Sequence, residues 1–437
     1  MKLLVTAIVL ALGSQPALAE DLLQVYALAQ KNDPQLAAAR ASRDATFEAR
    51  PLAKSQLLPS VSASADGTWQ DQRIFGSDSL SQLSNSGQYS SLGAGVNVVQ
   101  PLYRRDRLKR LDQADSQVAK AEADYVSAEQ ALALRVAQAY FDVLGAQDNL
   151  GFAQSERTAI ERQLDQAKQR FEVGLIAITG VHEAQARFDQ SRADEIVAQN
   201  DLDDAWEALR EIAGPDAVTQ LAHLKPLVPL DPPAPAEIDE WSQTALQNNP
   251  AVQSAMEAAE AARKEIEVQR SGNYPTVDLV GGYQLARSDA SRSVDANTAS
   301  IGIQLAMPLY TGGGVAAATR QAQYNFEAAQ ETLDQQRRAV DKEVRNAYRG
   351  VTASIEGVKA LEASMVSAQS ALDATMAGFD VGTRTMVDVL NAQRDLYGAK
   401  RNHARARYLY VLNLLTLEQA AGTLDVEDLQ RVNAWLE

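Results

Sequence analysis

The sequence predicts a mainly α-helical fold with a smaller β part, in which one long helical pattern occurs twice. Apolar residues recur at steps of three or four over residues 104–171, as on one face of a helix, and the pattern returns over 312–379. Its one irregularity, two successive steps of four, begins at Ala128 and again at Gln336, 208 residues later. We interpret this shared irregularity as the mark of an internal duplication.

Both long helices are expected to run without interruption. No proline lies between Pro101 and Pro215 or after Pro308, and proline inside a helix kinks or breaks it. At a rise of about 1.5 Å per residue, each helix would be roughly 100 Å long. A helix of this length spans a distance, which a globular domain does not require. The irregular steps would locally unwind a coiled coil, so that the helices could lie side by side as a wall.

Residues 1–19 have the pattern of a secretory signal peptide. Lys2 supplies the positive start, 3–12 are apolar, and the small residues Ala17 and Ala19 form a cleavage site. The apolar run is too short to span a membrane as a helix. We expect a mature chain that begins at Glu20 and leaves the cytoplasm.

The composition excludes several classes of function. The net charge of −16 argues against nucleic acid as a partner, because nucleic acid requires a basic face. The chain has no cysteine, so no disulfide contributes to its stability. The only three histidines, His182, His223 and His403, do not have metal-ligand spacing. We therefore expect no enzyme activity, no metal and no cofactor.

We expect two structural repeats, over 20–213 and 237–437, joined by a proline-rich linker over 214–236. In the first repeat, Pro34 suits the first turn of a helix that should run to about Gln56. The other main elements of the first repeat are a β-hairpin at about 60–101, a long helix over 104–171 and a return helix over 181–212. In the second repeat they are a hairpin at about 276–308, a long helix over 313–379, a return helix over 386–420 and a C-terminal segment.

The hairpins alternate apolar and polar residues with a period of two, which is typical of outer-membrane strands. In the first strand, Val61 and Trp69 lie on the apolar face and Ser60 and Thr68 on the polar face. Strands of ~10 residues have the length that a tilted membrane strand needs. Four strands are too few to close a barrel. Either the hairpins form a soluble sheet, or three chains pool their strands into twelve, which is wide enough for a pore.

Each long helix ends in a Phe-x-Val-Gly sequence, at 171–174 and at 379–382. Glycine is favoured directly after a helix because it adopts the left-handed conformation without strain. We therefore expect both long helices to turn at these glycines into their return helices.

The second turn, with the sequence Val-Gly-Thr-Arg-Thr-Met-Val-Asp-Val-Leu-Asn-Ala over 381–392, closely resembles the TolC family of outer-membrane export ducts. The resemblance covers nearly the whole mature chain, including both repeats, both Phe-x-Val-Gly turns and the late Ala421-Gly422-Thr423-Leu424. It implies a homotrimer in which four strands per chain form a shared 12-stranded β-barrel in the outer membrane. The duplicated coiled-coil helices would form an α-helical tunnel across the periplasm.

The resemblance implies a passive channel for secreted proteins, small toxic compounds or both, by type I secretion, multidrug efflux or both. Its expected partners are outer-membrane lipid, a periplasmic adaptor protein and an inner-membrane ABC or proton-driven transporter. The alternative is a fibrous coiled-coil adhesin or a periplasmic scaffold protein with a soluble β head.

Two residues match the family's constricted tunnel entrance. Asp388 matches an aspartate that rings this entrance, and Asn391 matches a second ring aspartate, from which this chain departs. Asp388 also suits a structural role. With Thr385 as the N-cap it occupies the third helical position, where an acid stabilises the start of a helix.

Three further positions correspond to the latch that holds the family's entrance closed. Phe379 and Arg384 match an aromatic residue and an arginine that bind the first-repeat turn. The position of their acidic partner is occupied by Gly180, a second departure. Glu183, one helical turn further on the same face, is the expected substitute partner of Arg384. Without that pairing, the closed state would be loosely latched.

Overall fold

The computed structural model describes residues 20–73, 87–215, 218–289 and 295–437, so the expected signal peptide lies outside the described residues. The described chain forms two compact units. We call the unit that contains Ser42–Asp124 and Gln253–Gln336 the sheet unit, because it includes all four strands. The other, the helix unit, contains Tyr125–Val252, Arg337–Glu437 and the described part of Met1–Ala41. Each unit therefore includes residues from both halves of the sequence, and the predicted mainly helical fold with a small sheet is confirmed.

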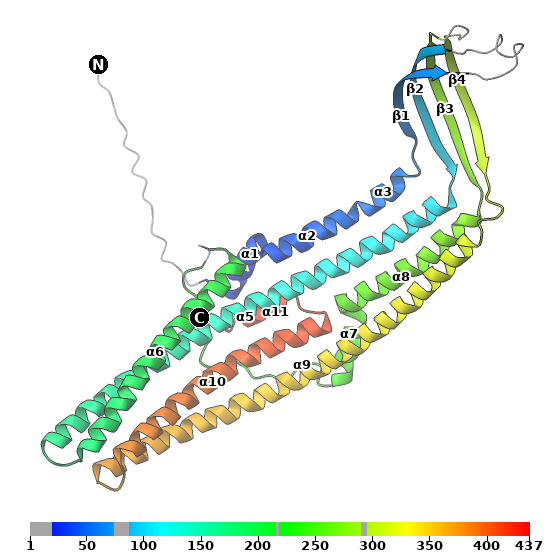
Figure 1. Ribbon diagram of the computed structural model, residues 1–437. Coiled ribbons are helices and arrows are strands. Elements are labelled where there is room, and N and C mark those ends of the chain that lie inside the picture. Colours follow the sequence, from blue (N-terminus) through cyan, green and yellow to red (C-terminus); the bar gives the residue numbers. More distant parts are fainter. Residues whose placement is uncertain (1–19, 74–86, 216–217, 290–294) are drawn as a thin grey trace, which may run out of the picture. The chain divides into compact units, whose positions relative to one another are not determined.

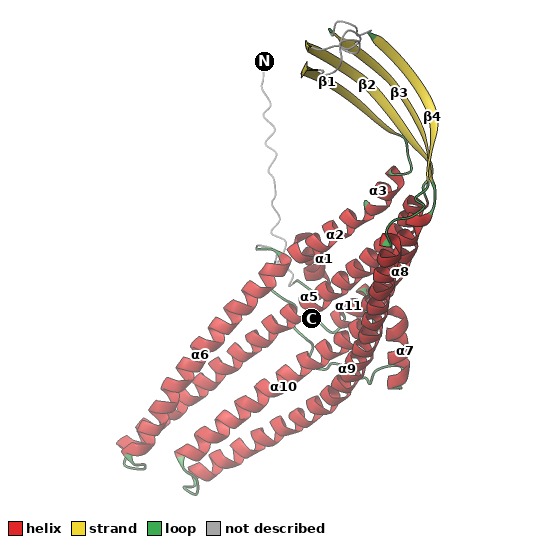
Figure 2. Ribbon diagram, turned by 45° about the vertical axis from the view of Figure 1, so that its right-hand side comes forward, coloured by secondary structure: helices red, strands yellow, loops and turns green. Residues whose placement is uncertain are grey.

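Four antiparallel strands form one sheet in the order β1-β2-β3-β4 (Figure 2). They are β1 (Ser60–Gln72), β2 (Gly87–Tyr103), β3 (Thr276–Ser288) and β4 (Ala296–Ala306). The strands pair as two hairpins, β1 with β2 and β3 with β4, and the hairpins join through β2 and β3. The register of this central pairing shifts between Pro101 and Tyr103, where proline has no N–H to donate.

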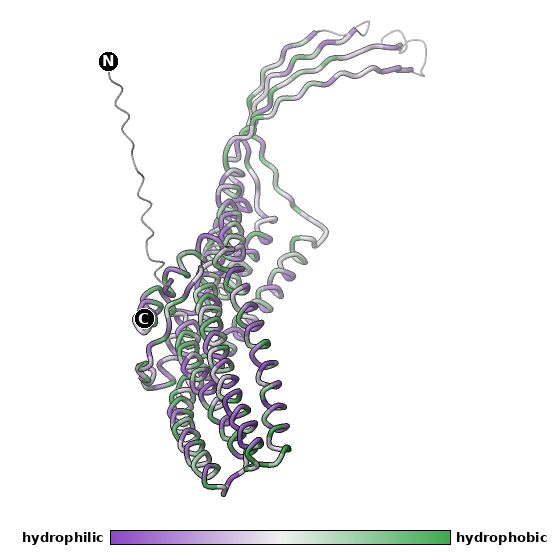
Figure 3. Tube along the Cα trace, turned by 90° about the vertical axis from the view of Figure 1, so that its left-hand side faces the viewer, coloured by the Kyte–Doolittle hydropathy of each residue, from purple (hydrophilic) through white to green (hydrophobic). Residues whose placement is uncertain are grey.

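One face of the sheet is apolar and exposed in the single chain. Val61 is 68% exposed, Leu92 67% and Ile301 81%. Hydrophobic residues alternate with hydrophilic ones along the strands (Figure 3). Within the described sheet, β1 and β4 each pair on one side only, so both outer edges have unpaired backbone groups. The sheet therefore lacks a partner on both edges and on its apolar face.

The helix expected over 34–56 is instead two helices, α2 (Pro34–Phe47) and α3 (Ala49–Ser55). The prediction of one helix was wrong at Glu48, which lies in a turn between them. Pro51 explains the break, because it has no N–H to donate to the carbonyl of Phe47, four residues earlier.

Four helix ends meet the same end of the sheet (Figure 1). α3 leads into β1, and β2 leads into α5 (Arg105–Glu172). α8 (Pro250–Arg270) leads through the short η1 (Ser271–Asn273) into β3, and β4 leads into α9 (Gly314–Asp380). Because neighbouring strands are antiparallel, all four connections lie at one end of the sheet.

The helix unit combines parts of α2, α5, α8 and α9 with five further helices. These are α1 (Leu22–Asn32), α6 (Ile178–Ala213), α7 (Ile238–Asn248), α10 (Met386–Ala421) and α11 (Val426–Asn433). Its core includes the buried Tyr140, whose hydroxyl donates to the Ala222 carbonyl at 2.8 Å, and Phe141, whose ring lies 5.8 Å from that of Tyr408. None of the described helices is both long and apolar enough to cross a membrane.

α6 begins at Ile178, three residues before the expected start of the return helix at 181. The turn after α5 is tighter than expected, because Gly174 adopts a φ of 77° and the Leu175 N–H donates to the Arg170 carbonyl at 2.8 Å. Gly180 therefore lies inside the first turn of α6, where its N–H donates to the Ala177 carbonyl.

Gly422 ends α10 in a left-handed conformation, with a φ of 74°. A Cβ atom there would lie 2.5 Å from Asn249 Cα and 2.7 Å from the Asn248 carbonyl oxygen, so backbone would have to move. We expect Gly422→Ala to lower the free energy of unfolding by about 2–4 kcal/mol, from backbone strain and overpacking together. Thermal unfolding followed by circular dichroism measures the change as a lower midpoint.

Gly357 supplies the matched control, because it lies inside α9 with no atom within 4 Å of an added Cβ. Gly357→Ala should leave the midpoint unchanged or raise it slightly, since alanine favours the helix. Equal midpoints for the two variants would show that the close approach at Gly422 does not limit stability.

Candidate functional site at the two helical turns

Two turns of the helix unit have the same design. The first joins α5 to α6, and the second joins α9 to α10. Gly174 has a φ of 77° in the first turn and Gly382 a φ of 81° in the second. Their N–H groups donate to the Phe171 carbonyl at 2.9 Å and the Phe379 carbonyl at 3.1 Å. Both Phe-x-Val-Gly sequences therefore end their helices through a left-handed glycine, as predicted.

The helix ends next to these turns share one apolar core. Phe379 is 9% exposed and packs with buried residues from α5, α6, α9 and α10. The members of this cluster are Ile160, Leu164, Ala167, Ala184, Leu372, Phe379, Met386, Val389, Leu390 and Leu396. Burial of these side chains holds the α5–α6 and α9–α10 hairpins together near their turns.

Arg170 links the end of α5 to the end of α9. Its Nη2 lies 2.7 Å from Asp380 Oδ1, and its guanidinium carbon lies 4.5 Å from the centre of the Phe379 ring. The arginine side chain is 30% exposed and the aspartate side chain 67% exposed. The contact therefore combines a partly solvated ion pair with a cation–π interaction. Sequence reasoning missed both charged residues, although each adjoins the phenylalanine of a Phe-x-Val-Gly sequence.

A cleft of about 680 Å³ lies between the two turns, and it brings most of the predicted latch residues together. Gly180, Glu183, Phe379 and Arg384 all line it, as do Arg170 and Asp380. Asp388 and Asn391 do not belong to its lining.

Arg384 and Glu183 share this cleft without a polar bond between them. In the part of the chain that the structure describes, no hydrogen bond or ion pair joins their side chains. Arg384 instead lies against the last turn of α9, where a Cβ added to Gly378 would be 2.8 Å from Arg384 Cγ. The substitute pairing of Arg384 with Glu183 stays a prediction.

Asp388 caps the start of α10. One of its carboxylate oxygens accepts from the Thr385 N–H at 2.9 Å and from the Thr385 hydroxyl at 2.8 Å. The Asp388 N–H donates back to that hydroxyl at 3.3 Å, so the predicted N-cap is confirmed. The two bonds from Thr385, with a smaller effect from the charge of Arg384, hold the pKa of Asp388 below its ordinary value. The carboxylate is therefore ionised at neutral pH.

Asn391, the departure from the second ring aspartate, has a partner on the other hairpin. Arg187 of α6 donates from Nη2 to Asn391 Oδ1 of α10 at 3.3 Å. This bond is a further polar link between the hairpins, besides Arg170 with Asp380 and Arg401 with Glu156. Among the described residues, no three His, Cys, Asp or Glu side chains gather closely enough to hold a metal ion.

The chain matches one protein family over most of its length. Residues 25–215 and 241–423 match the family described as outer membrane efflux protein. The outer membrane protein TolC of Vibrio cholerae serotype O1 is 42% identical over 443 residues, covering 100% of this chain and 99% of the relative. The alkaline protease secretion protein AprF of Pseudomonas aeruginosa is 31% identical over 96% of this chain and 88% of its own length. The solved structure of CusC has a TM-score of 0.80 at 19% identity, covering 93% of this chain and 92% of that one, which shows a shared fold.

Proposed function

Because the chain belongs to the outer membrane efflux protein family, we propose that three copies assemble into one channel that conducts substrates passively out of the cell. The protein is an outer-membrane channel of the class used for type I secretion and efflux. We place its barrel in the outer membrane and its long helices in the periplasm. The energy for export would come from an inner-membrane ABC or proton-driven transporter, connected by a periplasmic adaptor.

The observation that supports the trimer is the incomplete sheet. β1 and β4 leave unpaired edges on both sides of the described sheet, next to an exposed apolar face. In lipid, each unpaired backbone group would cost several kcal/mol. Three copies joined edge to edge supply twelve strands and leave no edge unpaired. The same arrangement places the apolar face against lipid.

We propose that the two repeats, over 20–213 and 237–437, are the building blocks of this channel. The family match supports the division, because its two segments, 25–215 and 241–423, fall almost wholly inside one repeat each. Each chain contains two such repeats, so three chains would form a channel wall from six similar repeats.

We propose that the two helical turns form the entrance gate on the periplasmic side. Three copies of Asp388 would ring the entrance, and the Arg170–Asp380 contact would hold the two hairpins of each chain together in the closed state. The ionised carboxylate of Asp388 and the position of Arg170 between the hairpins support these roles.

Matched lysine substitutions on β4 test the trimeric membrane channel. Ile301 and Ser300 are neighbours on opposite faces of β4, the apolar and the polar face. We expect Ile301→Lys to prevent stable insertion, because a charge facing lipid costs about 2–4 kcal/mol. Ser300→Lys should be tolerated, because its face would border water. Native mass spectrometry in mild detergent measures the fraction of trimer. Fractionation of the outer membrane measures how much of the protein is inserted.

The native protein is expected to run as a trimer in these measurements. A detergent-solubilised monomer with intact strands would contradict the proposal. Equal tolerance of both lysines, with release of the protein without detergent, would favour the adhesin or scaffold with a soluble β head.

A further inference from the structure

The start of α5 carries an unusual concentration of positive charge. Five of the seven residues from 104 to 110 are arginine or lysine and one is acidic, in a chain whose net charge is −16. Positive side chains near the N-terminus of a helix are unfavourable, because the helix dipole is positive there. These basic residues therefore destabilise the start of α5, which suggests that they serve a function such as binding.

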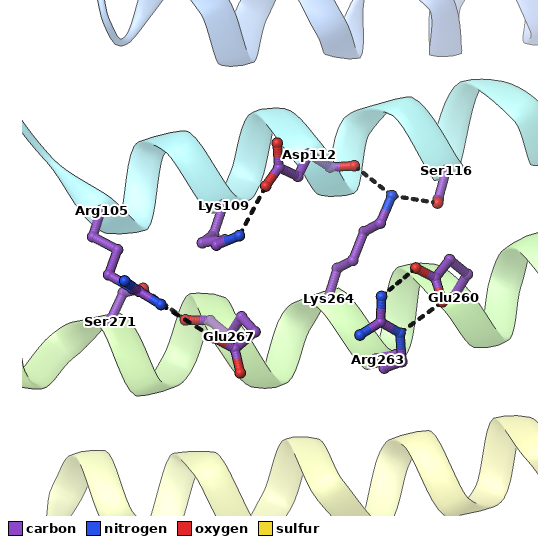
Figure 4. Close-up of polar contacts among 9 residues, drawn as sticks. All are labelled: Arg105, Lys109, Asp112, Ser116, Glu260, Arg263, Lys264, Glu267 and Ser271. Carbon is purple, nitrogen blue, oxygen red and sulfur yellow. Dashed lines mark hydrogen bonds and ion pairs between the residues drawn. The ribbon is translucent and has the colours of Figure 1, made fainter.

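Part of this charge is neutralised within the sheet unit. Arg104 pairs with Asp278, and Arg105 pairs with Glu267 at 3.5 Å while its guanidinium lies 4.3 Å from the Tyr274 ring. Lys109 pairs with Asp112 at 3.1 Å. Figure 4 shows Arg105 and Lys109 turned toward these carboxylates, and Lys264 of α8 turned toward the Asp112 carbonyl and the Ser116 hydroxyl of α5, each at 2.9 Å.

Other basic side chains at the same end of the sheet have no acidic partner. Lys54 lies in the last turn of α3, Arg110 in the second turn of α5 and Arg320 in the second turn of α9. All three are exposed, and in the described parts of the chain their side chains form no hydrogen bond or ion pair. Arg107 donates to the Gln56 carbonyl and forms no ion pair within the described residues, although its charge acts on Asp278, the partner of Arg104. We call these four residues the basic band.

The topology gathers the basic band at one level. α3, α5 and α9 all meet the same end of the antiparallel sheet (Figure 1). Each residue of the band lies within two helical turns of the helix end nearest the sheet, which corresponds to about 10 Å. Exposed apolar and aromatic residues lie at this level: Leu102, 53% exposed, near the end of β2, and Leu309 and Tyr310, 89% and 88% exposed, between β4 and α9.

Such a combination matches the boundary between a bilayer and water. Tyrosine is enriched at this boundary, and lysine and arginine reach it with their long side chains. We propose that Lys54, Arg107, Arg110 and Arg320 bind the phosphate groups of anionic phospholipids in the membrane leaflet that faces the helices. This inference rests on the proposed function, because it requires the sheet to lie in a membrane.

The test measures lipid preference in the intact trimer. Detergent-solubilised protein is mixed with equal amounts of phosphatidylglycerol and phosphatidylcholine, and native mass spectrometry counts the lipids bound per trimer. Each basic side chain near a charged membrane surface changes lipid binding roughly fivefold. We therefore expect a preference for phosphatidylglycerol that falls at least tenfold in the Lys54→Ser, Arg110→Ser, Arg320→Ser triple variant. Inorganic phosphate, added together with the lipids at millimolar concentration, should not displace the bound phosphatidylglycerol.

A second triple variant controls for the loss of charge itself. Arg192, Arg338 and Arg349 are exposed, form no side-chain hydrogen bond or ion pair within the described residues and belong to the helix unit. Their replacement by serine should leave the lipid preference unchanged. Replacement of Arg110 and Arg320 by lysine, which keeps the charge, should also preserve it.

Three results would overturn the proposal that the basic band binds anionic phospholipids. These are an unchanged preference in the first triple variant, an equal loss in the control variant, and displacement of the lipid by inorganic phosphate. If a serine variant fails to assemble, the Arg110→Ser, Arg320→Ser double variant is compared with its lysine counterpart. If the native protein forms a trimer without any lipid preference, only the proposed lipid binding is refuted. If the native protein forms no membrane trimer, the proposed function itself is refuted.

Discussion

Replacing Asp388 with alanine is expected to abolish the block of the channel by multivalent cations added on the periplasmic side. In the proposed trimer, three ionised carboxylates meet at the entrance and repel one another, so a multivalent cation that lies between them is stabilised. The affinity of a cation site depends strongly on the number of charged ligands. We therefore expect the blocking concentration to rise on the order of a hundredfold.

Planar-bilayer recordings measure this change directly. Asp189→Ala, on α6, is the control, because it removes the same charge from an exposed residue near the other turn. The pH dependence gives an independent check. Because the block requires ionised Asp388 carboxylates, it should be complete at neutral pH and weaken as these carboxylates are protonated at acid pH. A block that persists in Asp388→Ala would place the cation site elsewhere.

Replacing Arg170 with alanine is expected to raise the resting conductance of the closed channel. The variant loses the ion pair with Asp380 and the cation–π contact with Phe379. Since the ion pair is partly exposed, we take about 1 kcal/mol per chain for both contacts together. Three chains that open together would lose about 3 kcal/mol, which is on the order of a hundredfold in the ratio of open to closed channels.

Arg162→Ala is the control for this measurement, because Arg162 is exposed on α5 about two helical turns before Arg170. Its conductance should equal that of the native channel. A resting conductance in Arg170→Ala no higher than in Arg162→Ala would show that the Arg170–Asp380 contact does not restrain the gate.

Two further variants separate this latch from the predicted pairing of Arg384 with Glu183. If that pairing forms between chains of the trimer, Glu183→Ala should raise the conductance as Arg170→Ala does. Gly180→Asp restores the acid at the family position, and an added Cβ there comes no closer than 3.4 Å to Ile176. If Glu183→Ala has no effect while Gly180→Asp lowers the conductance, the substitute pairing is wrong and Arg384 lacks an acidic partner.

The local sequence explains most of the secondary structure. The spacing of apolar residues and the absence of proline predict α5 and α9 to within one or two residues. Glycines at 174 and 382 predict both turns, and Thr385 with Asp388 predicts the start of α10. These features depend on neighbours within about one helical turn, so a short window of sequence contains the information. The break at Glu48 is also local, because Pro51, three residues later, has no N–H to continue the helix.

The contacts at the candidate gate depend on tertiary structure. Arg170 meets Asp380 across 210 residues of sequence, and Arg187 meets Asn391 across 204. Arg384, in contrast, lies in the same cleft as Glu183, and no hydrogen bond or ion pair among the described residues joins the two. The apolar pattern of a helix shows which face is buried, but the partner of an exposed charged side chain depends on how the helices pack and which rotamers fit between them. The sequence by itself therefore determined the long helices, their turns and the family, whereas the packing of the two hairpins decided which side chains join them.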